Sequence, residues 1–146
     1  MDIQTITLDP LRRVKPVKVI IPERYTLLEP GQPKLPPVTT GSKIGVARVY
    51  EDSEAYLSPK TMLRRAVRAD QSPIDNLQDL EEILAHKPYI SDEYLVTDIK
   101  LRGPDGEYVL CLWREARKWF VWSINFRPFN RDKTFARAYA VLCYGK

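Results

Sequence analysis

Four apolar runs in the last third of the chain restrict its fold more than any other feature of the sequence. The first two, 94–101 and 107–113, are joined by Gly103-Pro104-Asp105-Gly106. Proline supplies the φ angle of the second turn position, aspartate suits the third, and glycine accepts positive φ at the fourth. Two apolar runs joined by such a turn predict a β-hairpin.

Two more apolar runs follow at 119–126 and 135–144, each after a short polar link. Both have the length of a strand and are rich in aromatic and β-branched residues. The sequence therefore predicts a four-stranded antiparallel meander over residues 94–144.

Two Ser-Pro pairs before these runs predict two helices. In Ser58-Pro59 the serine is a favourable N-cap and the proline suits the first helical position, which predicts a helix over 59–70. Ser72-Pro73 repeats the pattern and predicts a second helix over 73–86. Helices followed by strands indicate an α+β fold, with both helices on one face of an antiparallel sheet.

Residues 1–57 differ from the rest in their proline content, because seven of the 12 prolines lie within the first 37 residues. Proline forbids helix interiors and interrupts strand ladders, so we expect an extended arm with short β pieces. The runs 17–21 and 44–50 are the best strand candidates, and 29–37 is typical of a polyproline-like loop. We therefore divide the chain into this arm, 1–57, and an α+β core domain, 58–146.

The composition suits one hydrophobic core, with 146 residues of which 44% are apolar. No apolar run approaches the ~18 residues of a membrane span, and the first residues do not resemble a signal peptide. We expect a virion or cytoplasmic protein with no membrane partner. The net charge of +4 fits contact with nucleic acid or with an acidic protein surface, and equally fits an ordinary solvated surface.

The two cysteines, Cys111 and Cys143, fall on the second and fourth expected strands. In a meander the third strand separates them by more than the ~5.5–6 Å between Cα atoms that a disulfide needs. We expect two buried free thiols.

Residues suited to catalysis are sparse. His86 is the single histidine, and it has no cluster of cysteines or carboxylates at ligand spacing, which argues against zinc. There is no glycine-rich phosphate loop and no nucleophile elbow. We expect no enzyme activity, no cofactor and no bound metal, and interpret His86 as a residue that stabilises a helix C-terminus.

One enzymatic alternative is a divalent-metal nuclease. Asp98 and Lys100 on one strand could act with nearby carboxylates, namely Glu81, Glu82 and Asp92. About one acid-x-Lys triplet is expected by chance in this composition, and short motif matches carry that risk. A structure in which Asp98 and Glu82 lie far apart would exclude this alternative.

Aromatic residues of the expected sheet are interleaved with arginines and lysines. They include Trp113, Trp119, Phe120, Trp122 and Phe126, beside Arg114, Arg117, Lys118 and Arg127. Such a surface can stack bases while cations contact phosphates. The competing interpretation is that both sheet faces are buried, one by helices and the other by the arm or a neighbouring subunit.

A row of cations is expected along the first helix, where Lys60, Arg64 and Arg68 are spaced by four residues and Arg65 lies beside them. These residues are our candidates for nucleic-acid contact. The alternative is an ordinary solvated helix face.

Together these features favour a non-enzymatic structural subunit of a larger assembly. Proline-rich arms are usually ordered only when packed on their own sheet or on a neighbour. By analogy with arms that wrap neighbouring subunits, we expect a phage-like virion component such as a capsid, connector or tail protein. The expected interface residues lie on the arm and the sheet: Val17, Val19, Ile21, Pro36, Pro37, Trp113, Trp119 and Trp122. The alternative is a nucleic-acid-binding regulatory module.

Overall fold

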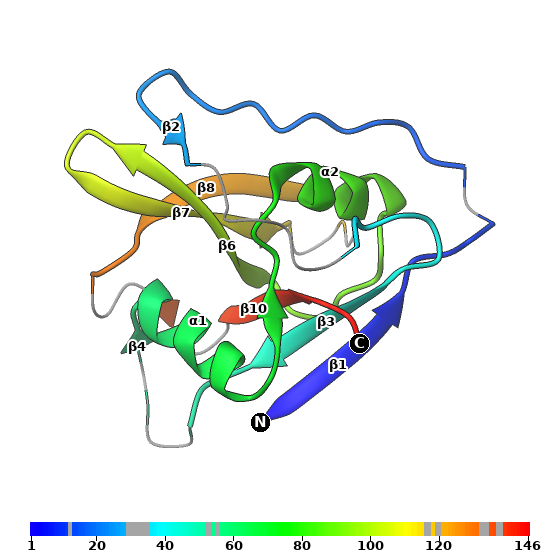
Figure 1. The fold of residues 1–146 in the computed structure, drawn as a ribbon, viewed down its shortest axis with the longest axis horizontal. Coiled ribbons are helices and arrows are strands. Elements are labelled where there is room, and N and C mark those ends of the chain that lie inside the picture. Colours follow the sequence, from blue (N-terminus) through cyan, green and yellow to red (C-terminus); the bar gives the residue numbers. More distant parts are fainter. Residues whose placement is uncertain are drawn as a thin grey trace.

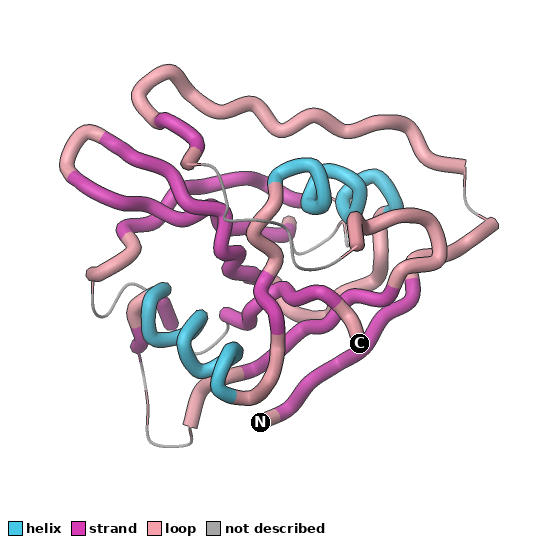
Figure 2. The backbone as a smooth tube through the Cα atoms, in the orientation of Figure 1, coloured by secondary structure: helices cyan, strands magenta, loops and turns pink. Residues whose placement is uncertain are grey.

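The computed structural model describes residues 1–11, 13–28, 36–51, 54, 56–115, 118, 121–131, 135–136 (backbone) and 139–146. Figures 1 and 2 show two helices and a strongly twisted sheet in this part of the chain. In chain order the elements are β1 (Asp2–Thr7), β2 (Thr26–Leu27), β3 (Lys43–Arg48), β4 (Tyr56–Leu57), α1 (Pro59–Arg68), β5 (Ser72–Pro73), α2 (Leu77–His86), β6 (Tyr94–Gly103), β7 (Gly106–Arg114), β8 (Trp122–Pro128), β9 (Phe135–Ala136) and β10 (Tyr139–Tyr144).

The described strands form an eight-stranded open sheet in the order β1-β3-β10-β6-β7-β8, with β2 beside β6 and β5 beside β10. All neighbours in this sheet are antiparallel except β10 and β6, which are parallel. A separate two-stranded piece pairs β4 with β9. The predicted α+β fold class is confirmed.

The predicted hairpin is β6–β7, in which Gly103 pairs with Gly106 across Pro104 and Asp105. Gly106 has a φ of 142°, the positive value expected of the glycine in this turn. The strand β8 then pairs along β7, so three strands of the expected meander are present.

The fourth run does not continue the meander, and this part of the prediction was wrong. Instead of pairing with β8, β10 lies between β3 and β6. Residues 139–143 are all buried, so both faces of β10 are covered. A strand that is apolar on both faces is best placed in the middle of a covered sheet, and a meander would have left it at the edge.

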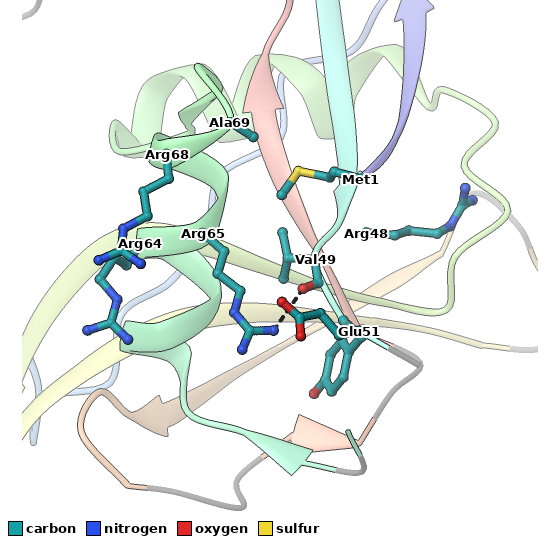
Figure 3. A pocket seen from close by; sticks show the side chains of 9 residues that line it. Met1, Arg48, Val49, Glu51, Arg64, Arg65, Arg68 and Ala69 are labelled. Carbon is teal, nitrogen blue, oxygen red and sulfur yellow. Dashed lines mark hydrogen bonds between the residues drawn. The ribbon is translucent and has the colours of Figure 1, made fainter. Parts of the chain in front are cut away.

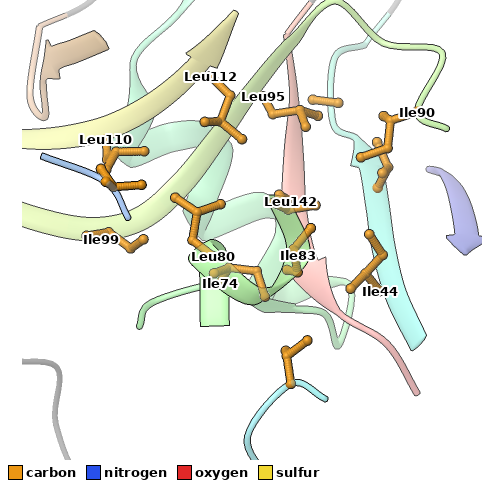
Figure 4. Close-up of a cluster of buried hydrophobic side chains, with 14 of the residues drawn as sticks. Ile44, Ile74, Leu80, Ile83, Ile90, Leu95, Ile99, Leu110, Leu112 and Leu142 are labelled. Carbon is orange, nitrogen blue, oxygen red and sulfur yellow. The ribbon is translucent and has the colours of Figure 1, made fainter. Parts of the chain in front are cut away.

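The two helices cover opposite faces of the sheet, which corrects the expectation that they share one. On one face Met62, Leu63 and Ala66 of α1 pack against alternate strand residues that include Val96 and Val141. On the other face Leu80 and Ile83 of α2 pack against the intervening strand residues, including Ile44, Leu95, Leu110 and Leu142 (Figure 4). Because strand side chains alternate, each face needs its own cover.

The chain passes from one face to the other at β5. Ser72 and Pro73 pair with the end of β10. Beyond them, Ile74 N–H donates to Leu142 O at 2.9 Å, and Ile74 O accepts from Asp98 N–H at 2.7 Å. The prediction that Ser72-Pro73 begins a helix was therefore wrong, since this segment fills a place in the sheet.

The helix starts follow capping chemistry. Ser58 Oγ accepts from Thr61 N–H at 3.1 Å and Pro59 is the first residue of α1, as predicted. At α2 the cap is Asn76, whose Oδ1 accepts from Gln78 N–H at 2.9 Å. This cap displaces the start of the second helix from 73 to Leu77.

The N-terminal third contributes strands to the sheet. The predicted strand at 44–50 is β3. The strand β1, which pairs along the whole of β3, was not predicted. The described range 13–25 contains no strand, so the strand predicted at 17–21 is not formed. Residues 29–35 of the predicted polyproline-like loop lie outside the described residues. Pro36 and Pro37, which end the predicted loop, are exposed.

Cys111 and Cys143 are buried free thiols, as predicted. The strand that separates them is β6 and not β8. Burial raises the pKa of the Cys143 thiol to about 12, and it raises that of Cys111 as well. In the described part of the chain, no helix is long and apolar enough to cross a membrane.

Candidate functional site

The outer face of α1 carries the predicted row of cations. Met62, Leu63 and Ala66 anchor the inner face in the core. Lys60, Arg64 and Arg68 are consequently exposed on the side away from the sheet. No acidic residue occurs among the ten residues of α1.

A hollow of about 490 Å³ opens between α1 and the end of β3. Arginines from both elements line it, with Arg48 on β3 and Arg64, Arg65 and Arg68 on α1, and Glu51 lies between them. Figure 3 shows Arg64 and Arg68 side by side, Arg65 turned toward Glu51 and Val49, and Arg48 on the far wall.

Arg65 is held inside the hollow by a carboxylate. Its guanidinium forms a bidentate ion pair with Glu54, with Nη2 2.6 Å from Oε2. Nη1 also donates to Val49 O at 3.1 Å. The pKa of Arg65 is raised, chiefly by the hydrogen bond to Glu54. This arginine thus ties α1 to the segment that follows β3.

Arg48 is likewise compensated. It contacts Asp92 through Nη2–Oδ1 at 2.8 Å and Nε–Oδ2 at 2.9 Å, and Asp2 through Nη1–Oδ2 at 2.5 Å. The hydrogen bond to Asp92, and next the one to Asp2, raises the pKa of Arg48. Its charge joins β1 and β3 to the segment before β6.

Arg64 and Arg68 form no ion pair with any residue that the structure describes, and the same holds for Lys60. Asp70, just beyond α1, pairs with Lys146 at 2.6 Å, and that contact lowers the pKa of Asp70. The uncompensated positive charge of this region is therefore concentrated on the outer face of α1.

The predicted interface residues of the arm differ in their burial. Val19 is buried, and its N–H donates to Glu81 Oε2 of α2 at 2.7 Å. Ile21 packs partly buried against the same core, and Val17 is exposed. Beyond the arm's loop, Val38 N–H donates to Asp79 Oδ1 at 2.8 Å.

The two described tryptophans of the expected aromatic surface lie on opposite faces of the sheet. Trp113 pairs with Ser123 and is 42% exposed, whereas Trp122 pairs with Arg114. The Arg114 guanidinium lies 5.9 Å from the Trp122 ring, which packs on the core that α2 covers. Because neighbouring strand residues alternate, these tryptophans do not form one stacking platform. Trp119, Phe120 and Arg117 lie outside the described residues.

The carboxylates of the nuclease alternative contact separate partners. Asp98 Oδ1 is 3.9 Å from Lys100 Nζ, Glu81 binds the arm, and Asp92 binds Arg48. Glu82 Oε1 lies 3.6 Å from Nδ1 of the buried His86, the last residue of α2 as predicted. Within the described ranges, no group of three His, Cys, Asp or Glu residues could hold a metal ion.

A partly buried polar cluster beneath α2 had no signal in the sequence. Tyr144 Oη lies 2.6 Å from Asp79 Oδ2 and 3.1 Å from Asp75 Oδ1. Burial, followed by the contact with Asp79, raises the pKa of the Tyr144 phenol. Together with the Val38 bond, this cluster joins β10, α2 and the returning arm. Its residues are far apart in the sequence, so no local sequence pattern could have predicted it.

No model of a known protein family matches the chain, and comparisons with curated proteins and with solved structures find no match either. The class that the fold defines is α+β, with a mixed, mostly antiparallel open sheet covered by one helix on each face.

Proposed function

We propose that this chain is a non-enzymatic structural subunit that assembles with further copies of itself, as in a phage-like virion component. The observation that carries the proposal is the segment 13–22, which runs outside α2 without joining the sheet (Figure 1). Assembly through this segment would bury apolar surface that the single chain leaves in water.

The exposed side chains of the segment support this role. Ile20 is 83% exposed and Leu11, two residues before the segment, is 90% exposed, whereas Val19 is buried. Because successive side chains of an extended chain point in opposite directions, Val19 holds the segment on its own subunit while Ile20 remains available to a neighbour. Extended backbone with apolar side chains is also suited to strand addition.

The edge strand β1 offers a second surface of the same kind. It lies at one end of the strand order, its residues are exposed or half-buried, and Ile3 is 37% exposed. Natural edge strands are commonly protected by lysine or proline, and β1 contains neither. An assembly subunit would use such an edge instead of protecting it.

Light scattering tests the proposal. We expect the wild-type chain at about 100 µM to have a molar mass well above the 17.0 kDa monomer. The double variant Leu11→Lys/Ile20→Lys should be monomeric because charged side chains oppose burial of the segment. Val67→Lys, which changes a 60% exposed side chain on α1, is the matched control and should assemble normally. A monomeric wild type, or equal assembly of all three proteins, would refute the proposal.

A further inference from the structure

The strongest unassigned feature of the molecule is the charge of α1. Four cations and no acidic residue occur in this helix. A solvated helix face usually carries both signs, since pairs three or four residues apart stabilise it. Here like charges are stacked at a spacing of four, which is unfavourable unless an external anion compensates them.

The structure divides these cations into two groups. Arg65 faces inward to Glu54, and Arg48 across the hollow is held by Asp2 and Asp92. Lys60, Arg64 and Arg68 face outward and pair with no carboxylate in the described residues. Arg65 and Arg48 are held in the hollow by carboxylates. Arg64 and Arg68 also line the hollow, but they and Lys60 have no carboxylate partner among the described residues and remain available to a ligand.

The geometry of the outward group selects the class of ligand. Eight residues of α-helix separate Lys60 from Arg68, which places the row over about 12 Å. Cations in a line match a chain of charges, whereas a single small anion needs donors that converge on one point. Duplex DNA carries about one negative charge per 1.7 Å of axis, so several phosphates can lie along such a row.

We propose that the outer face of α1 binds the phosphate backbone of a nucleic acid, through Lys60, Arg64 and Arg68, beside the hollow that Arg65 and Arg48 shape. The contact is electrostatic and independent of base sequence, because these side chains lie along one helix face and reach phosphates. It does not depend on self-assembly through residues 13–22, which lie against α2 on the opposite face of the sheet.

Fluorescence anisotropy with a labelled 20-base-pair duplex DNA tests this proposal across 50–200 mM NaCl. Three phosphate contacts predict a slope of about −3 in log affinity against log salt. Arg64→Gln/Arg68→Gln should reduce the magnitude of the slope by about 2 and weaken binding roughly tenfold at 50 mM salt. Light scattering on the same samples reports assembly separately.

Arg24→Gln/Arg102→Gln is the matched control, since it removes the same charge from two exposed arginines that lie outside both α1 and the segment 13–22. It should keep the slope and affinity of the wild type. Equal loss in the control would indicate only general charge attraction and overturn the assignment to α1. Absence of binding at 50 mM salt would also overturn it, as would a 20-residue polyglutamate that competes as well as unlabelled DNA, because an acidic protein partner would then fit better.

Discussion

The helices α1 and α2 have ten residues each and cover opposite faces of one sheet, yet their polar side chains differ in what they contact. On α2 the side chains of Asp79 and Glu81 accept from the backbone N–H groups of Val38 and Val19, whereas Glu82 lies beside His86 of the same helix. On α1 three of the four cations face solvent. The polar side of α2 therefore holds the arm in place, whereas that of α1 is available for binding.

The two helices should nevertheless be alike in their apolar contribution, and this gives the largest expected effect. Leu80 of α2 and Met62 of α1 are both fully buried. Leu80→Ala and Met62→Ala should each lower the free energy of unfolding by about 2–5 kcal/mol, measured by urea denaturation. Val67→Ala on the exposed side of α1 should change it by less than about 0.5 kcal/mol. Equal, small losses for all three would mean that the helices do not cover the sheet.

The polar residues should separate the helices. Asp79→Ala removes the acceptor of Val38 N–H and of the Tyr144 hydroxyl, so we expect a loss of about 2–3 kcal/mol. Arg68→Ala on α1 should cost less than about 0.5 kcal/mol. Thermal unfolding of both variants measures the difference. A large cost for Arg68→Ala would place this arginine among the structural residues.

The crossing between the two faces should respond to pH. Burial raises the pKa of Asp98 to about 6, against the opposing effect of Lys100. The folded protein therefore holds this proton more tightly than the unfolded chain, whose aspartates titrate near 3.9. The stabilisation from Asp98 is complete below about pH 4 and is lost progressively as the pH rises through about 6.

Urea denaturation at pH 4 and pH 7 measures this effect against Asp98→Asn. From pH 4 to pH 7 the free energy of unfolding of Asp98→Asn should rise by about 1–2 kcal/mol relative to that of the wild type, because the amide does not ionise. Lys100→Gln removes the charge that lowers the pKa of Asp98, so the free energy of unfolding of this variant should depend on pH more steeply than that of the wild type. An unchanged difference between wild type and Asp98→Asn at both pH values would contradict the raised pKa.

The smallest expected effect distinguishes neighbouring arginines within α1. Arg65→Gln should cost about 1 kcal/mol, and a double-mutant cycle with Glu54→Gln should give a coupling of about 0.5–1 kcal/mol. Arg64→Gln should be neutral and uncoupled to Glu54. Coupling of equal size for Arg64 would show that both arginines share the carboxylate.

Much of the candidate site could be predicted from the sequence, because a spacing of four on a helix places side chains on one face. Lys60, Arg64 and Arg68 were found in this way. The separate role of Arg65 could not be predicted, since its partner Glu54 precedes the helix in an irregular segment. The placement of Trp113 and Trp122 on opposite faces required the register between β7 and β8.

Features that depend on neighbouring residues follow directly from the sequence. These are the Ser58 cap, the turn between β6 and β7, and the apolar alternation that requires cover on both faces. Tertiary structure alone decided that β10 returns to pair with β3, where Val141 meets Ala47, and that α2 begins after β5. Local signals act over a few residues, whereas strand order follows from which distant apolar surfaces bury each other best. That comparison is made only in the folded chain.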